Sequence, residues 1–131
     1  MSEFASARII RRCFVGCAWL FAAAIALQVL IAGLALFVDS ANWAAHISFA
    51  RYFGLLPLVM IALAWIGRFP SKTVLKSVGL FGMIIGMFLT AIFSSRIGGL
   101  SALHPVIALM LFWSSMDTIR TIRSAKPIMR K

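Results

Sequence analysis

The stretch CFVGCAWLFAAAIALQVLIAGLALFV, from Cys13 to Val38, decides the fold of this chain. It contains no charged residue, and Gln28 is its only strongly polar side chain. A helix rises about 1.5 Å per residue and a bilayer core is about 30 Å thick, so about 20 apolar residues cross it. The stretch therefore predicts a first transmembrane helix over residues 13–38.

Three further apolar runs follow, at about residues 44–66, 74–93 and 103–119. A segment inside a bilayer must satisfy its own backbone hydrogen bonds, so each run is expected to be helical. Because the connections are short, consecutive spans should be antiparallel neighbours. We therefore predict an all-α membrane protein with one domain over residues 1–131. Its expected architecture is an up-down-up-down bundle of four transmembrane helices.

The composition supports a membrane protein over a soluble one. Hydrophobic residues make up 63% of the chain and charged residues only 12%, whereas soluble domains are about half apolar and about a quarter charged. A net charge of +10 is typical of nucleic-acid binding when it forms a basic face. Here the basic residues lie between the apolar runs. We interpret them as a topology signal, and expect the lipid bilayer rather than nucleic acid as the partner.

The positions of the positive charges predict the orientation, because basic loops stay in the cytoplasm. Of the 13 basic residues, only Arg51 and Arg96 fall on the side of the first and third connections. We therefore expect both termini in the cytoplasm and a multi-pass protein of the bacterial inner membrane, whose basic C-terminal tail lies against anionic headgroups. The basic residues on the inner side are Arg8, Arg11, Arg12, Arg68, Lys72, Lys76, Arg120, Arg123, Lys126, Arg130 and Lys131.

Some packing features can also be predicted. Gly79, Gly82 and Gly86 form a small-residue stripe that allows close helix approach; we expect another helix of the bundle there, with a homodimer seam as the alternative. Pro57 should kink the second span, because it lacks a backbone N–H. Gln28 should hydrogen-bond a neighbouring helix, with a ligand as the alternative partner.

The chain has two histidines, His46 and His104. Each lies near the start of an even-numbered span, so both are expected at the outer face and at similar depth. Two facing imidazoles suit the axial positions of a haem iron, and helical bundles commonly hold such groups. We therefore predict haem b with His46 and His104 as iron ligands. The alternative is that the histidines only mark the interface, with Pro105 starting a helix.

Two arginines complete the predicted site. Arg51 lies in the outer part of the second span, where a charged side chain is costly and usually functional. We expect Arg51 and Arg96 to bind the two haem propionates through charge-assisted contacts. The alternatives for Arg51 are an extended side chain that reaches the interface or an ion pair with Asp39.

A histidine after the first outer loop and the motif Leu103-His104-Pro105 at the last helix carry a family resemblance. The chain resembles one half of haem A synthase, in which histidines lie near the outer starts of the second and fourth helices. The resemblance implies haem ligation by His46 and His104. The chain is also similar to a small, uncharacterised bacterial family of single four-helix units with paired histidines.

The sequence departs from haem A synthase at two points. Trp43 stands where that family has a glutamate three residues before the first histidine. Cys13 and Cys17 lie at the inner end of the first span, whereas many members have a cysteine pair in an outer loop. These departures favour haem binding without the oxidative chemistry of that family.

The leading functional hypothesis is therefore an integral membrane b-type haem protein with bis-histidine ligation, for electron transfer or haem handling. An enzyme is the less expected class, because two histidines leave no open position on the iron. For haem carriage, His104 beside the rigid Pro105 is the expected displaceable ligand. The alternative is a cofactor-free helical subunit or assembly factor. The expected partners are a redox partner or a larger membrane complex.

Overall fold

The computed structural model describes residues 2–124 of the chain. The predicted contact of the tail with headgroups falls partly on residues 125–131, which lie outside the described residues. The described elements are α1 (Ser2–Phe37), α2 (Asn42–Phe53), α3 (Leu56–Ile66), α4 (Ser71–Ile92), α5 (Ser94–Ile97), the 3-10 helix η1 (Gly98–Ala102) and α6 (Leu103–Ser124).

The structure confirms an all-helical membrane fold over the described residues. Four stretches are long and apolar enough to cross a bilayer, and α2 with α3 makes up the second of them. The first and last helices are longer than predicted: α1 begins at Ser2 and α6 ends at Ser124. Both helices continue past the apolar runs into basic sequence. A hydropathy criterion does not count such basic residues as part of a span.

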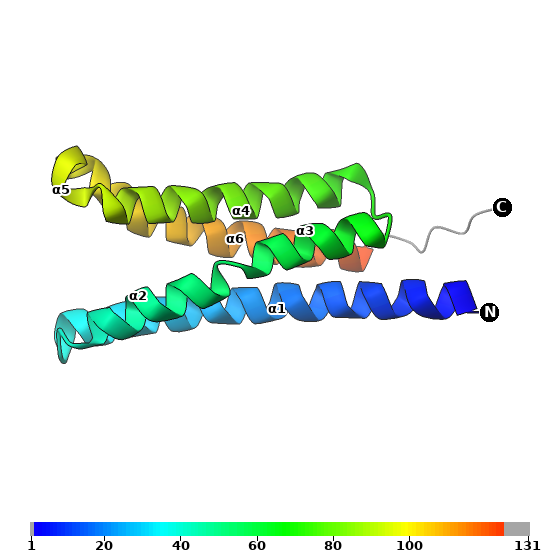
Figure 1. The fold of residues 1–131 in the computed structure, drawn as a ribbon, viewed down its shortest axis with the longest axis horizontal. Coiled ribbons are helices and arrows are strands. Elements are labelled where there is room, and N and C mark those ends of the chain that lie inside the picture. The colour runs from blue at the N-terminus through cyan, green and yellow to red at the C-terminus, as the bar shows by residue number, and fades with distance from the viewer. Residues whose placement is uncertain (1, 125–131) are drawn as a thin grey trace.

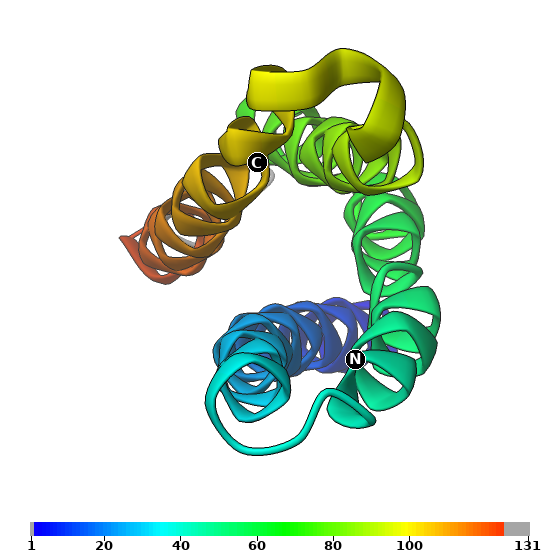
Figure 2. The ribbon, with the colours of Figure 1, turned by 90° about the vertical axis from the view of Figure 1, so that its left-hand side faces the viewer.

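The helices pack in sequence order around the bundle. Helix α1 contacts α2, α3 and α6, and α4 contacts α3 and α6. The second and fourth spans therefore lie diagonally opposite each other (Figure 2). The first turns of α1 and the last turns of α6 share one end of the bundle, here named the terminal end. The α1–α2 connection, α5 and η1 form the other end, here named the loop end (Figure 1).

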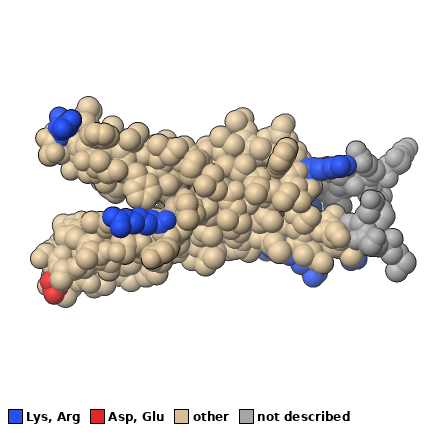
Figure 3. Space-filling model, viewed as in Figure 1, with Lys and Arg blue, Asp and Glu red and all other residues tan. Residues whose placement is uncertain are grey.

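The core lies toward the terminal end. On α4 no described residue after Ile84 is buried, and on α6 none before Leu111 is buried. The helix pairs thus diverge at the loop end, where the molecule divides into two lobes, one over α4 and α5 and one over α1 and α2 (Figure 3). The fully buried apolar side chains include Phe14, Ala18, Phe21, Met60, Ala64, Leu80, Leu111 and Ile119.

The second span is interrupted where the sequence predicts a kink. Helix α2 ends at Phe53 and α3 begins at Leu56, with Pro57 in its first turn. Proline has no N–H to continue the helical hydrogen bonds, and its ring displaces the preceding turn. The break leaves α2 packed against α1, whereas α3 packs against both α1 and α4.

Gly54 lies at this break, where the second span packs closely against α4. A Cβ atom there would lie 2.8 Å from the carbonyl oxygen of Ala50 and 3.4 Å from side-chain atoms of Ile84 and Phe88 on α4. Any larger residue would push α4 away or distort the break. Glycine is therefore required here by space rather than by a positive φ.

The glycine stripe of α4 does not have the predicted intramolecular role. A Cβ atom on Gly79 or Gly82 would meet nothing within 4 Å, and one on Gly86 would only reach the Ile107 side chain at 3.8 Å. The expectation that another helix of the bundle packs against Gly79 and Gly82 is wrong, because these residues face outward. The homodimer seam stays a prediction.

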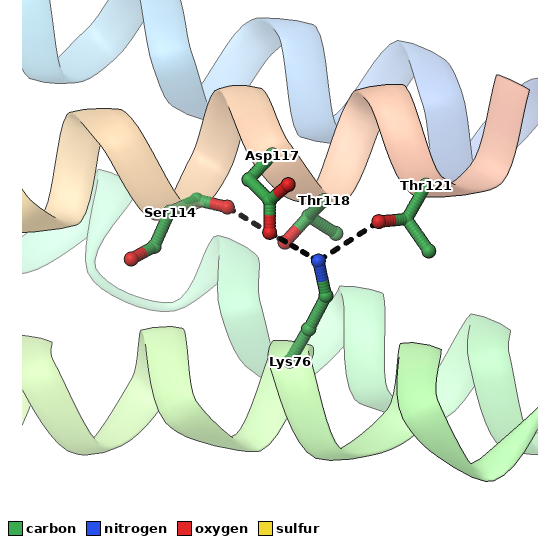
Figure 4. A network of polar contacts seen from close by, with 5 residues as sticks. All are labelled: Lys76, Ser114, Asp117, Thr118 and Thr121. Atoms are coloured by element: carbon green, nitrogen blue, oxygen red, sulfur yellow. Dashed lines mark hydrogen bonds and ion pairs between the residues drawn. The ribbon is translucent and has the colours of Figure 1, made fainter. Parts of the chain in front are cut away.

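An ion pair joins α4 to α6 toward the terminal end. Lys76 Nζ pairs with Asp117 Oδ2 and also donates a hydrogen bond to Thr121 Oγ1 over 2.8 Å (Figure 4). From the sequence, Lys76 was predicted only as part of the positive inner flank. In the structure it also joins two neighbouring helices.

Candidate functional site

His104 is the second residue of α6, directly after η1. Its Nδ1 atom lies 3.1 Å from the carbonyl oxygen of Met87 and 3.0 Å from Thr90 Oγ1, both on α4. A carbonyl oxygen only accepts hydrogen bonds, so Nδ1 carries the ring hydrogen. The Nε2 atom then keeps its lone pair. Metal-ligating histidines usually have this arrangement, with the second nitrogen donating to a carbonyl or similar acceptor.

Thr90 is compatible with this tautomer. Its hydroxyl lies 3.0 Å from the carbonyl oxygen of Gly86 and 2.9 Å from that of Met87, so it donates to its own helix. The Oγ1 lone pairs then accept from His104 Nδ1. Helix α4 thereby fixes both the orientation and the protonated nitrogen of this imidazole.

His46 lies in the second turn of α2 and is half-buried. Its ring meets the edge of Trp43, with ring centroids 5.3 Å apart and an interplanar angle of 82°. The Nδ1 atom is buried and has no hydrogen-bond partner among the described residues. A buried polar atom left unpaired costs about 1–3 kcal/mol. A ligand at this nitrogen would remove that cost.

The main chain of His46 is tied to the first span. Gln28 Nε2 donates a hydrogen bond to the carbonyl oxygen of His46 over 2.8 Å, which confirms the predicted contact of Gln28 with a neighbouring helix. Gln28 is buried, with 7% of its surface exposed. Its Oε1 atom is buried and has no partner among the described residues. Two unpaired polar atoms therefore lie beside the α1–α2 contact.

The structure places both histidines at the loop end, on the diagonally opposed α2 and α6. Within the described residues, no group of three or more His, Cys, Asp or Glu side chains is able to hold a metal ion. Two imidazoles are the donor set of a bis-histidine haem iron and half of what a closed zinc site needs.

Arg96 also lies at the loop end, and Arg51 lies in the half of the second span nearer to that end. Arg51 is in the last turn of α2 and Arg96 is in α5, and the two basic groups at this end lie over these helices (Figure 3). Both side chains are exposed, and neither has a hydrogen bond or ion pair with the described residues. Asp39 instead accepts a hydrogen bond from the Ala41 N–H over 2.8 Å. The alternative that Arg51 pairs with Asp39 is therefore wrong.

A bundle of four membrane-crossing helices defines the class: the chain is a multi-pass helical membrane protein. Residues 28–96 match a family of unknown function, DUF6220, and the chain belongs to this family. The matched region begins at Gln28, contains His46 and Arg51, and ends at Arg96, before His104. No curated protein and no solved structure matches the chain.

The contacts of His104 with Met87 and Thr90 were not predicted from the sequence. A signal for them exists in the topology. Helices α4 and α6 are antiparallel and joined through α5 and η1, so residues about equally far in sequence from Ile97, the last residue of α5, lie opposite each other. This rule pairs Thr90 with His104, and it also pairs Lys76 with Asp117.

Proposed function

We propose that this chain is an integral membrane b-type haem protein in which His46 and His104 are the two axial ligands. The observation that carries the proposal is the pair of uncommitted imidazole nitrogens at one end of the bundle. His104 has Nε2 free with Nδ1 committed to Met87, and His46 has a buried Nδ1 without a partner. Both facts fit a metal centre better than they fit simple interfacial histidines.

Two arginine side chains fit the propionate edge of the same haem. Arg51 and Arg96 are the exposed, unpaired cations of the loop end, and a guanidinium binds a carboxylate through paired charge-assisted hydrogen bonds. We assign them to the two propionates. The divided loop end (Figure 3) leaves room between the α1–α2 and α4–α6 pairs that the core does not fill.

A haem with two imidazole ligands supplies one-electron transfer and has no open position for oxygen. The residues of this chain then bind and orient the group rather than act on a substrate. We therefore propose electron transfer or haem handling, with a redox partner, and not an enzyme. Helix α4 holds the His104 ring through two contacts, whereas the Nδ1 atom of His46 has no hydrogen-bond partner among the described residues. If haem is passed on, His46 is the ligand that exchanges, which is the opposite of the expectation from Pro105.

For the orientation we propose both termini in the cytoplasm and the loop end outside, in the bacterial inner membrane. The support is the distribution of the 13 basic residues, of which only Arg51 and Arg96 belong to the loop end, together with the cytoplasmic preference of such residues. A reporter fused after Lys131 should be active only in the cytoplasm. Activity only in the periplasm would contradict this orientation.

An absorption spectrum tests the haem proposal. Protein extracted from membranes of haem-supplied cells should have a Soret band that shifts on reduction. The double variant His46→Ala, His104→Ala should lose the band. The matched control is Ile47→Ala with Leu103→Ala, because these exposed residues are sequence neighbours of the histidines; it should keep the band. A wild-type spectrum from the double histidine variant would refute the ligand assignment.

One observation favours a second candidate, a cofactor-free subunit or assembly factor of a larger membrane complex. The outward face at Gly79 and Gly82 has nothing within 4 Å of either position, so a helix of another protein is able to approach closely there. A preparation that stays colourless after haem supply, and that co-purifies with a partner unless Gly82 is replaced by Leu, would favour this candidate.

A further inference from the structure

A second candidate site lies at the terminal end, at the opposite end of the bundle from the histidines. A shallow hollow there is lined by Arg8, Arg11, Arg12, Val15 and Gly16 of α1 and by Arg123 of α6. Four guanidinium groups thus border one depression whose floor is apolar. We propose that this hollow binds the phosphate headgroup of an anionic glycerophospholipid.

The arginines converge because of helix geometry and one anchoring contact. Arg8 and Arg12 are four residues apart on α1, so they lie on one face of the helix. Arg11 Nη2 donates a hydrogen bond to the carbonyl oxygen of Ile122 over 2.5 Å, which joins α1 to the last turns of α6. This contact brings Arg123, the next residue, to the edge of the hollow. Arg11 acts as a positioning residue, and Arg8, Arg12 and Arg123 provide the exposed charges.

Arg8, Arg12 and Arg123 have no ion pair with a carboxylate among residues 5–124, whose side chains the structure describes. The ion pair in this part of the chain joins Lys76 to Asp117, between α4 and α6. Guanidinium groups bind phosphate oxygens through paired hydrogen bonds, and basic pockets between transmembrane helices bind anionic headgroups. The charge of the hollow therefore fits a phosphodiester.

The apolar side of the hollow points to a lipid rather than to a soluble phosphate. Gly16 leaves open space beside the helix, since a Cβ atom there would meet nothing within 4 Å. One turn further into the membrane, Trp19 and Leu20 are 44% and 59% exposed. Residues three and four positions apart share a helix face, so an acyl chain leaving the glycerol at Gly16 runs along Trp19 and Leu20.

The test measures phosphatidylglycerol binding to the full-length protein in detergent by native mass spectrometry. The variant Arg12→Gln with Arg123→Gln should bind this lipid at least tenfold more weakly, because each basic residue contributes about fivefold near a membrane surface. The matched control, Arg68→Gln with Lys72→Gln, removes the same charge from the α3–α4 connection and should bind nearly as well as the wild type. Equal losses in both variants would overturn the proposal.

A further variant separates the lipid from free phosphate. Gly16→Leu fills the apolar part of the hollow, so it should weaken phosphatidylglycerol binding while the charges stay in place. Phosphatidylcholine and glycerol phosphate, used as probes, should bind at least tenfold more weakly than phosphatidylglycerol. Equal binding of glycerol phosphate, or full binding by Gly16→Leu, would contradict a lipid site. The arginine variants should keep the Soret band, so this proposal and the haem proposal fail independently.

Discussion

The side-chain amide of Gln28 donates a 2.8 Å hydrogen bond to the backbone carbonyl of His46, and so joins the C-terminal third of α1 to the second turn of α2. This contact is the main polar tie between α1 and the helix that carries the first proposed ligand. Because Gln28 is almost fully buried, the position of His46 depends on it.

Replacing Gln28 with Leu should therefore loosen α2 and weaken haem retention. Hydrogen bonds between membrane helices contribute about 0.6 kcal/mol on average and up to about 1.7 kcal/mol, so the loss of stability should be modest. Thermal unfolding in detergent and the rate of haem loss to apomyoglobin measure the two effects. Leu30→Ala, which changes an exposed residue of the same helix, is the control. Identical behaviour of both variants would show that the contact does not position His46.

The Thr90 hydroxyl should matter for haem affinity but not for folding. Thr90→Val keeps the shape of the side chain and removes the acceptor at 3.0 Å from His104 Nδ1. Loss of a partner behind a metal ligand typically costs 10–100-fold in affinity. We expect the lower end, about tenfold in a haem titration, because the Met87 carbonyl still accepts from Nδ1. Thr121→Val makes the same chemical change at the terminal end and should leave haem affinity unchanged.

Gly54 and Gly82 should respond oppositely to alanine. A Cβ atom at Gly54 collides with the Ala50 carbonyl and crowds α4, and such overpacking costs about 1–3 kcal/mol. Gly82 is helical and open, so alanine there should be neutral or stabilising, because glycine is the poorer helix former by about 1 kcal/mol. Thermal unfolding of the two variants is the measurement. A stable Gly54→Ala protein would contradict the close approach of α4 to the break.

The Lys76–Asp117 ion pair should contribute little by itself. Asp117 has 54% of its side chain exposed and Lys76 has 21%, and exposed ion pairs typically contribute about 0.2–1 kcal/mol. A double-mutant cycle with Lys76→Met and Asp117→Asn should give a coupling energy in this range. The stability should fall with added salt in the wild type more than in the double variant. A coupling near zero at low salt would show that the pair does not fix the α4–α6 register.

The broad architecture was predictable because hydropathy alone determines which segments cross a bilayer. The four apolar runs predicted the four spans, and Pro57 predicted the break in the second span. The helix ends were less predictable, since the basic first turns of α1 are helical without being apolar. The glycines show the main limit of the sequence, because composition does not tell which side of α4 faces the bundle. Gly79 and Gly82 were predicted to face another helix of the bundle, but in the structure they face outward.

The residues of the proposed site were predictable from the sequence, but their hydrogen bonds were not. The positions of His46 and His104 at one end followed from span order alone. The position of the α4–α6 connection pairs His104 with Thr90, but the hydrogen bond to Met87 also depends on side-chain orientation, which the order of the spans does not specify. The arginine hollow was likewise not predicted, because in the sequence Arg8, Arg12 and Arg123 indicate only the topology. It depends on the side-by-side packing of the first and last helices.

The spin state of the bound iron tests the central claim most directly. Electron paramagnetic resonance of the oxidised wild-type protein should show a low-spin ferric haem, because two imidazoles provide a strong axial field. His46→Ala should give a high-spin signal, since α4 still holds His104 in place as a single ligand. A low-spin signal that survives in the His46→Ala, His104→Ala double variant, or a wild-type protein with no haem signal after haem supply, would contradict bis-histidine ligation.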